Sequence, residues 1–96
     1  MPVPTAAHAQ WASQRWPGTD TTALQHGRTL YIDNCARCHN LYLPGAFTEK
    51  EWVDIMPKMK KKARITDSEA DSILRYVLSS AAIQPLPVQQ TIEMEQ

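Results

Sequence analysis

The stretch that decides the fold is Cys35-Ala36-Arg37-Cys38-His39, two cysteines three residues apart followed at once by a histidine. This C-x-x-C-H pattern is typical of c-type haem attachment. Each thiol can form a thioether with one of the two vinyl groups of a porphyrin, and the adjacent imidazole then reaches the axial position of the iron. The sequence therefore predicts one covalently bound haem c, anchored by Cys35 and Cys38 and ligated by His39.

Three other interpretations of the two cysteines have less support in the sequence. A zinc site needs two further ligands, and only His8 and His26 remain among the histidines, at irregular spacing. A thioredoxin-like dithiol belongs to a βαβ pattern, which this sequence lacks, and the histidine after the second cysteine is superfluous there. The spacing also disfavours a plain disulfide.

The bulk composition narrows the class of protein. The 96 residues suffice for one domain, and ten basic and ten acidic residues give a formal net charge of zero. Nothing in this balance indicates nucleic-acid or membrane binding. No apolar run is long enough for a transmembrane helix, and Met1-Pro2-Val3-Pro4 lacks the pattern of a secretory signal. If the protein is exported, we expect its signal or anchor to be absent from this chain.

Local patterns predict an all-α fold with three main helices around one haem and extended tails. The first helix covers residues 21–34, with Thr21 or Thr22 as its cap. The second begins at Thr48, where Thr48-Glu49-Lys50-Glu51 is a capping box, and Pro57 is expected to kink or end it.

The third helix is predicted most clearly. It begins with a second capping box, Thr66-Asp67-Ser68-Glu69. One apolar stripe follows, formed by Ala70, Ile73, Leu74, Val77, Leu78 and Ala81.

The predicted domain organisation has three parts: an N-terminal extension over residues 1–20, a haem domain over 21–83, and a C-terminal tail or linker over 84–96. The extension contains Trp11 and Trp16, which is unusual for a disordered tail. These tryptophans either pack against the domain as a clasp or contact a partner.

The first predicted helix and its motif resemble the class I cytochrome c family. The resemblance rests on Leu24-x-x-Gly27-x-x-x-Tyr31-x-x-x-Cys35-x-x-Cys38-His39 and on Ile73-Leu74-Arg75-Tyr76-Val77-Leu78. It implies a fold in which the first and last helices cross, with Gly27 at the crossing. It also implies a single-electron carrier and not an enzyme.

A narrower resemblance is to small monohaem cytochromes that are electron-accepting subunits or domains of periplasmic dehydrogenases. It rests on Asn40-Leu41-Tyr42, Pro44 and residues 52–59. It implies a periplasmic or otherwise extracytoplasmic location and a dehydrogenase or oxidase as redox partner.

The resemblance also implies a methionine as the sixth iron ligand, which raises the haem potential. Met59 is favoured because it follows Trp52 by seven residues, as in the narrower subgroup, and Met56 is the alternative. A bis-histidine site using His26 or His8 has no support, and both are expected to be surface side chains. Trp52 and Tyr31, together with Leu74, are expected to line or support the pocket.

Five basic residues lie within seven positions: Lys58, Lys60, Lys61, Lys62 and Arg64. They are either a solvated helix end, where cations are favourable, or a docking surface that steers an acidic redox partner towards the haem. The chain between His39 and the sixth ligand is short, so an exposed haem edge and a homodimer across it are further expectations. A rival hypothesis is a ligand-sensing haem protein with an open iron, and a second is a subunit or domain of a larger oxidoreductase.

Overall fold

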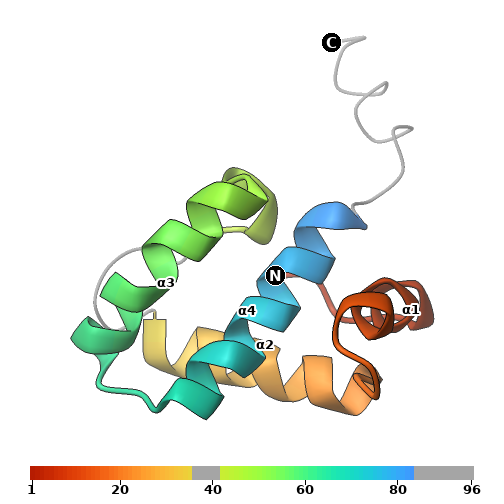
Figure 1. Cartoon of the computed structure of the whole chain (residues 1–96), viewed down its shortest axis with the longest axis horizontal. Coiled ribbons are helices and arrows are strands. Elements are labelled where there is room, and N and C mark those ends of the chain that lie inside the picture. Colours follow the sequence, from red (N-terminus) through yellow and green to blue (C-terminus); the bar gives the residue numbers. More distant parts are fainter. Residues whose placement is uncertain (36–41, 84–96) are drawn as a thin grey trace, which may run out of the picture.

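The computed structural model describes residues 1–35 and 42–83, and within them every regular element is a helix (Figure 1). This confirms the all-α fold. The motif residues Cys38 and His39 and the predicted tail, residues 84–96, lie outside the described residues. The elements in chain order are α1 (Ala6–Arg15), α2 (Thr21–Cys35), the short 3-10 helix η1 (Pro44–Ala46), α3 (Glu49–Ala63) and α4 (Asp67–Ala82).

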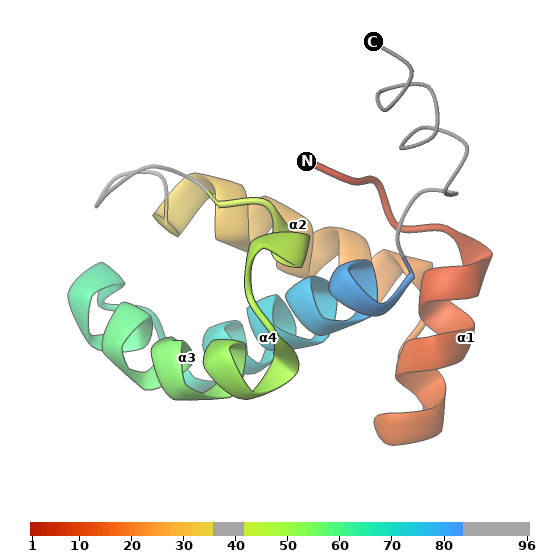
Figure 2. The ribbon, with the colours of Figure 1, turned by 90° about the horizontal axis from the view of Figure 1, so that it is seen from above.

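Helix α4 is the centre of the fold, because it contacts α1, α2, α3 and η1. Figure 2 shows α2 crossing α4, with α1 and α3 at opposite ends of the molecule. The predicted apolar stripe is buried at Ala70, Ile73, Val77 and Leu78, and Tyr76 is buried as well. The sequence did not assign Tyr76 to the core, since its burial depends on α2 packing against a second face of α4.

The crossing of α2 and α4 occurs at Gly27, as the sequence predicted. A Cβ atom at this position would lie 2.2 Å from the carbonyl oxygen of Ser72 and 3.0 Å from the Cβ of Tyr76. Only a residue without a side chain allows the two backbones to approach this closely. The closeness of the crossing explains why a glycine is tolerated inside a helix.

The predicted N-terminal caps are confirmed for α3 and α4 and are wrong for α2. The side chains of Thr48 and Thr66 accept from the backbone N–H groups three residues on, which confirms both capping boxes. For α2 the cap is Asp20, whose carboxylate accepts from the N–H of Ala23 at 2.8 Å, so the expected threonine cap is wrong. Asp is at least as good an N-cap as Thr.

Helix α3 continues past Pro57 to Ala63, so the proline does not end it. Proline removes the N–H that would reach the carbonyl of Val53. Both Val53 and Pro57 are exposed, so water can satisfy that carbonyl. The proline is tolerated inside α3 because it lies on the solvent-exposed side of the helix.

The N-terminal extension contains α1, a helix that the sequence analysis did not predict. Trp11 and Trp16 are half-buried against the core, and their ring centroids lie 6.1 Å apart. The Arg15 guanidinium packs over both rings and forms an ion pair with Glu49 of α3. The structure therefore confirms the clasp interpretation. The helix has a low amphipathic signal, but four of its ten residues are alanine, the best helix former.

His8 fixes α1 to the end of α4 and is buried, so the expectation of a surface side chain is wrong for it. Its Nδ1 accepts from the backbone N–H of Thr5 at 2.9 Å, and its Nε2 lies 3.0 Å from the carbonyl oxygen of Ile83. His26, by contrast, is exposed.

The first residues of the chain are held against the helix crossing. The hydroxyl of Tyr76 donates to the carbonyl of Pro2 at 2.6 Å, and the guanidinium of Arg28 donates to the same oxygen at 3.0 Å. Burial raises the pKa of the Tyr76 hydroxyl. Within residues 1–35 and 42–83, no helix combines the length and the apolar character needed to cross a bilayer.

Candidate haem site

The predicted haem site is divided between described and undescribed residues. Cys35 is the last residue of α2, whereas Cys38 and His39 lie outside the described residues. Four other predicted site residues have buried side chains in one hydrophobic cluster, and they come from α2 and α3: Tyr31, Trp52, Met56 and Met59. Leu74 of α4, also expected to line or support the pocket, is partly buried and packs against this cluster.

Tyr31 lies on α2 one helical turn before Cys35, and none of it is exposed. Its hydroxyl donates to the backbone carbonyl of Tyr42 at 2.6 Å. Tyr42 follows His39 by three residues, so this hydrogen bond joins the two sides of the haem motif. The Tyr31 side chain therefore lines the core with its ring and binds the backbone of Tyr42 with its hydroxyl.

Trp52 lies in the first turn of α3 and is also fully buried. Its Nε1–H donates to the carbonyl of Pro44 at 2.8 Å. The ring packs edge-on against Tyr31 at 5.9 Å between centroids and against Phe47 at 5.1 Å, and Phe47 in turn packs against Tyr42 at 5.2 Å. These edge-to-face pairs stabilise the segment that follows the motif. No sequence pattern pointed to Phe47, although it is the only phenylalanine in the chain.

Met56 and Met59 lie three residues apart on α3, and their exposed fractions are 6% and 7%. Both belong to the same cluster as Tyr31 and Trp52. A thioether is a soft ligand that c-type haem iron accepts. The donor chemistry and the aromatic surroundings of the described residues therefore fit a haem. The burial of both side chains does not distinguish the ligand from its neighbour.

No group of three or more His, Cys, Asp or Glu side chains suited to a metal ion occurs within residues 1–35 and 42–83. His8 already uses both ring nitrogens in contacts with Thr5 and Ile83.

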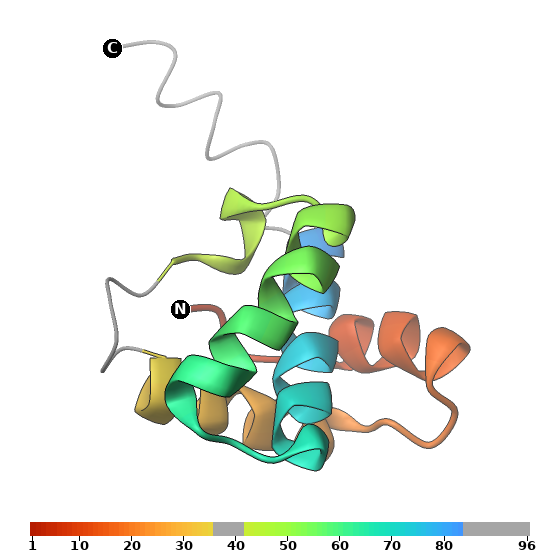
Figure 3. The same cartoon turned by 60° about the vertical axis from the view of Figure 1, so that its left-hand side comes forward.

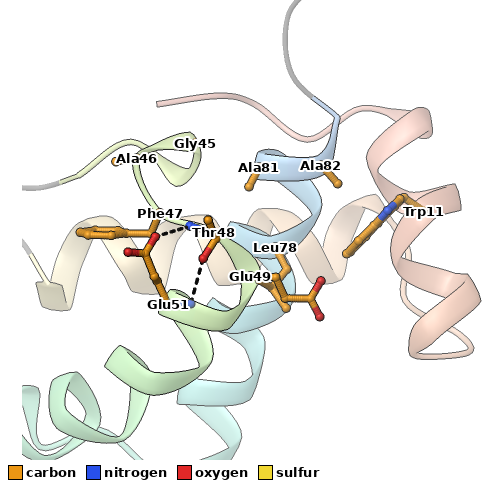
Figure 4. Close-up of a pocket in the computed structure, with 10 residues that line it drawn as sticks. All are labelled: Trp11, Gly45, Ala46, Phe47, Thr48, Glu49, Glu51, Leu78, Ala81 and Ala82. Carbon is orange, nitrogen blue, oxygen red and sulfur yellow. Dashed lines mark hydrogen bonds between the residues drawn. The ribbon is translucent and has the colours of Figure 1, made fainter.

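Two surface hollows lie apart from the predicted haem residues. One, of about 390 Å³, separates Trp11 of α1 from Phe47 and the start of α3, with the last turns of α4 as its floor (Figure 4). The carboxylate of Glu51 at its rim accepts from the backbone N–H of Thr48 in the capping box. The other, of about 650 Å³, is bounded by Met1, Pro2, Ser80 and residues 43–46. Neither is lined by Tyr31 or Trp52 or by the two methionines.

The predicted basic cluster lies at the C-terminal end of α3. Lys58, Lys61 and Lys62 are exposed, whereas Lys60 forms an ion pair with Asp67 at the start of α4. Arg64 is exposed and adopts a left-handed backbone conformation (φ 59°) as the C-cap of α3. Four of the five basic side chains are thus presented to solvent.

A comparison with protein families matches residues 31–95 to the family described as dihaem cytochrome c. The chain belongs to this family. Membership makes it a c-type cytochrome and implies a haem c electron carrier, in a class of proteins that are typically not enzymes and are usually extracytoplasmic. The match begins at Tyr31, so it includes the motif, α3 and α4, whereas α1 and most of α2 precede it.

Neither the search of curated proteins nor the search of solved structures found a match. The family name refers to two haems, but the 96 residues contain two cysteines and one C-x-x-C-H motif, enough for one covalent attachment.

Proposed function

We propose that this cytochrome carries single electrons between periplasmic redox partners, using one covalently attached haem c with His39 and Met59 as axial ligands. The observation that carries the proposal is the C-x-x-C-H motif, which begins at the last residue of α2. One helical turn before it, Tyr31 belongs to a buried cluster that contains two thioethers. Covalent anchoring suits so short a chain, because the haem is retained with few other contacts.

The haem supplies the redox chemistry, since its iron alternates between the ferric and ferrous states. The chain's own residues do the rest. Cys35 and Cys38 anchor the group, and His39 ligates the iron from the motif. The buried aromatic side chains of Tyr31 and Trp52 exclude water from the part of the haem site that α2 and α3 form. A low dielectric around the iron tunes its potential.

Met59 is proposed as the sixth ligand on the strength of its spacing from Trp52, and Met56 is its natural control. The two side chains share a helix and nearly the same exposed fraction, so each Met→Ala change removes a similar buried volume. We expect the oxidised wild type to show a weak red-region absorption band that Met59→Ala abolishes and Met56→Ala retains. The reduced wild type should not bind carbon monoxide.

Two other results would contradict Met59 as the sixth ligand. Loss of the band in Met56→Ala alone would make Met56 the ligand. A high-spin spectrum of the wild type that shifts with carbon monoxide would mean an open iron and favour a sensing function.

The number of haems is tested separately. A haem assay per mole of protein should give one haem per chain, because one C-x-x-C-H motif is present. A value of two would mean that this chain binds a second haem without the usual pair of thioethers and would refute the monohaem proposal.

The exposed basic side chains at the end of α3 are proposed to dock an acidic redox partner. Electrostatic steering raises the association rate and weakens with ionic strength. Lys61→Gln should lower the second-order rate of electron transfer at low salt by several-fold. Lys50→Gln is the matched control, because Lys50 is exposed on the same helix at its opposite end. Equal effects of the two substitutions, or no salt dependence, would exclude this docking surface.

A further inference from the structure

The solvent-exposed side of α3 has charged residues that the rest of the fold does not use. Figure 3 shows α3 along one side of the molecule, and α4 packs against it. The helix buries Trp52, Met56 and Met59. Four charged residues that lie away from these three are exposed, and we call them the outer stripe: Glu51, Asp54, Lys58 and Lys61.

The spacing of the outer stripe places its four members on one side of the helix. They lie at positions i, i+3, i+7 and i+10, which the helical period gathers within about 80° of arc over a length of about 15 Å. The two acidic residues belong to the first half of α3 and the two lysines to the second half. The outer stripe is therefore negative at one end and positive at the other.

Other charged residues of α3 are paired with neighbouring helices, whereas the outer stripe is not. Glu49 forms an ion pair with Arg15 of α1, and Lys60 forms one with Asp67 of α4. In the part of the chain that the structure describes, no member of the outer stripe belongs to an ion pair. Glu51 also accepts the N-terminal capping bond of α3. The stripe thus offers both signs of charge to a partner.

The order of these charges favours one kind of partner. A partner surface of a single sign would be attracted by two members of the stripe and repelled by the other two. A second copy of α3 turned end for end matches all four, because Asp54 meets Lys58 of the second copy and Glu51 meets its Lys61. Both contacts repeat about a two-fold axis. The formal net charge of zero also means that two copies do not repel each other at long range.

We propose that two copies of this chain associate about a two-fold axis, through the outer stripes of antiparallel α3 helices. Exposed ion pairs are weak and are screened by salt, so the dimer forms at high protein concentration and low ionic strength. Lys50, exposed beside the stripe, meets the basic end of the other copy and weakens the contact. The dimer covers Lys58 and Lys61, which also belong to the surface proposed to dock a redox partner.

Sedimentation equilibrium of the haem-loaded chain tests this interface. The wild type should show a monomer–dimer equilibrium at low salt that shifts to monomer at high salt. Asp54→Lys makes two attractive pairs repulsive, because the two-fold axis repeats the contact, and should weaken association about tenfold. Lys50→Glu removes a repulsive contact and should tighten association several-fold.

The matched control is the double exchange Asp54→Lys/Lys58→Asp, which leaves the amino-acid composition and the net charge unchanged. It reverses both members of each pair, so the two copies attract each other again across the axis. We expect it to restore the association that Asp54→Lys weakens.

Several outcomes would overturn the proposal. One is a wild type that stays monomeric at low salt and high concentration, and another is a double exchange that associates as weakly as Asp54→Lys. A dimer unaffected by Asp54→Lys and Lys50→Glu would mean that another face associates, such as an exposed haem edge. Assemblies larger than a dimer would indicate a head-to-tail contact, which does not close on itself, and would refute the two-fold pairing.

Discussion

Replacing Gly27 by alanine tests the packing on which this fold depends. The change places one methyl group at the crossing of α2 and α4. Its Cβ would lie 2.2 Å from the carbonyl oxygen of Ser72 and 2.9 Å from the carbonyl carbon. Real Cβ atoms do not approach other atoms closer than 3.0 Å. Both neighbours are backbone atoms, so no side chain can rotate away and the helices themselves must separate.

Two opposing terms set the size of the effect. Alanine in a helix interior is more favourable than glycine by about 1 kcal/mol. Overpacking of a tight interface costs about 1–3 kcal/mol, and the upper end applies here because backbone opposes the methyl group. We therefore expect a net loss of about 2 kcal/mol in the free energy of unfolding. For a domain of this size, that lowers Tm by roughly 8–16 °C.

The assay is thermal unfolding followed by circular dichroism on the haem-loaded protein. Thr29→Ala is the control, because Thr29 is exposed on the same helix and its replacement should raise stability by up to about 0.7 kcal/mol. A Gly27→Ala protein as stable as the wild type, or more stable, would refute the close crossing.

Three further predictions concern the caps and the N-terminal clasp. Thr66→Ala should cost about 1 kcal/mol of unfolding free energy, measured by denaturant titration, since it removes the acceptor for the N–H of Glu69. His8→Ala should speed amide hydrogen exchange in α1 and leave α2 unchanged, because it breaks the contact with Ile83; equal protection of α1 in both proteins would contradict this. Hydrogen bonds from Arg15 lower the pKa of the Glu49 carboxyl. The stability from this pair, under about 1 kcal/mol for so exposed a pair, should therefore be present above the unfolded pKa of 4.5 and be lost as pH falls through the lower folded pKa. Wild type and Glu49→Gln should thus differ in stability at neutral pH and converge in acid.

The haem motif and the starts of two helices were predictable because their signals are short. A C-x-x-C-H motif occupies five adjacent residues, and a capping box spans four, so neither depends on the rest of the chain. The starts of α3 and α4 agree with their capping boxes. Gly27 was also informative, because a glycine inside a helix needs a reason and a close crossing supplies one.

Candidate site residues were predicted less completely. The sequence selected Tyr31, Trp52 and the two methionines, and the structure buries all four in one cluster. It did not show that the polar atoms of Tyr31 and Trp52 bind the backbone carbonyls of Tyr42 and Pro44. Such bonds depend on where the chain returns after the motif, which no local pattern encodes.

The sequence by itself thus determined the helical class, the starts of α3 and α4 and the haem attachment motif, because each follows from residues within about one helical turn. Only the tertiary structure decided which polar side chains are buried. His8 is buried because its ring meets the carbonyl of Ile83, 75 positions along the chain. Tyr76 is buried because α2 and the N-terminal residues cover it, with Pro2 accepting its hydroxyl. Burial depends on the elements that surround a residue, and for the central α4 those come from the whole described length of the chain.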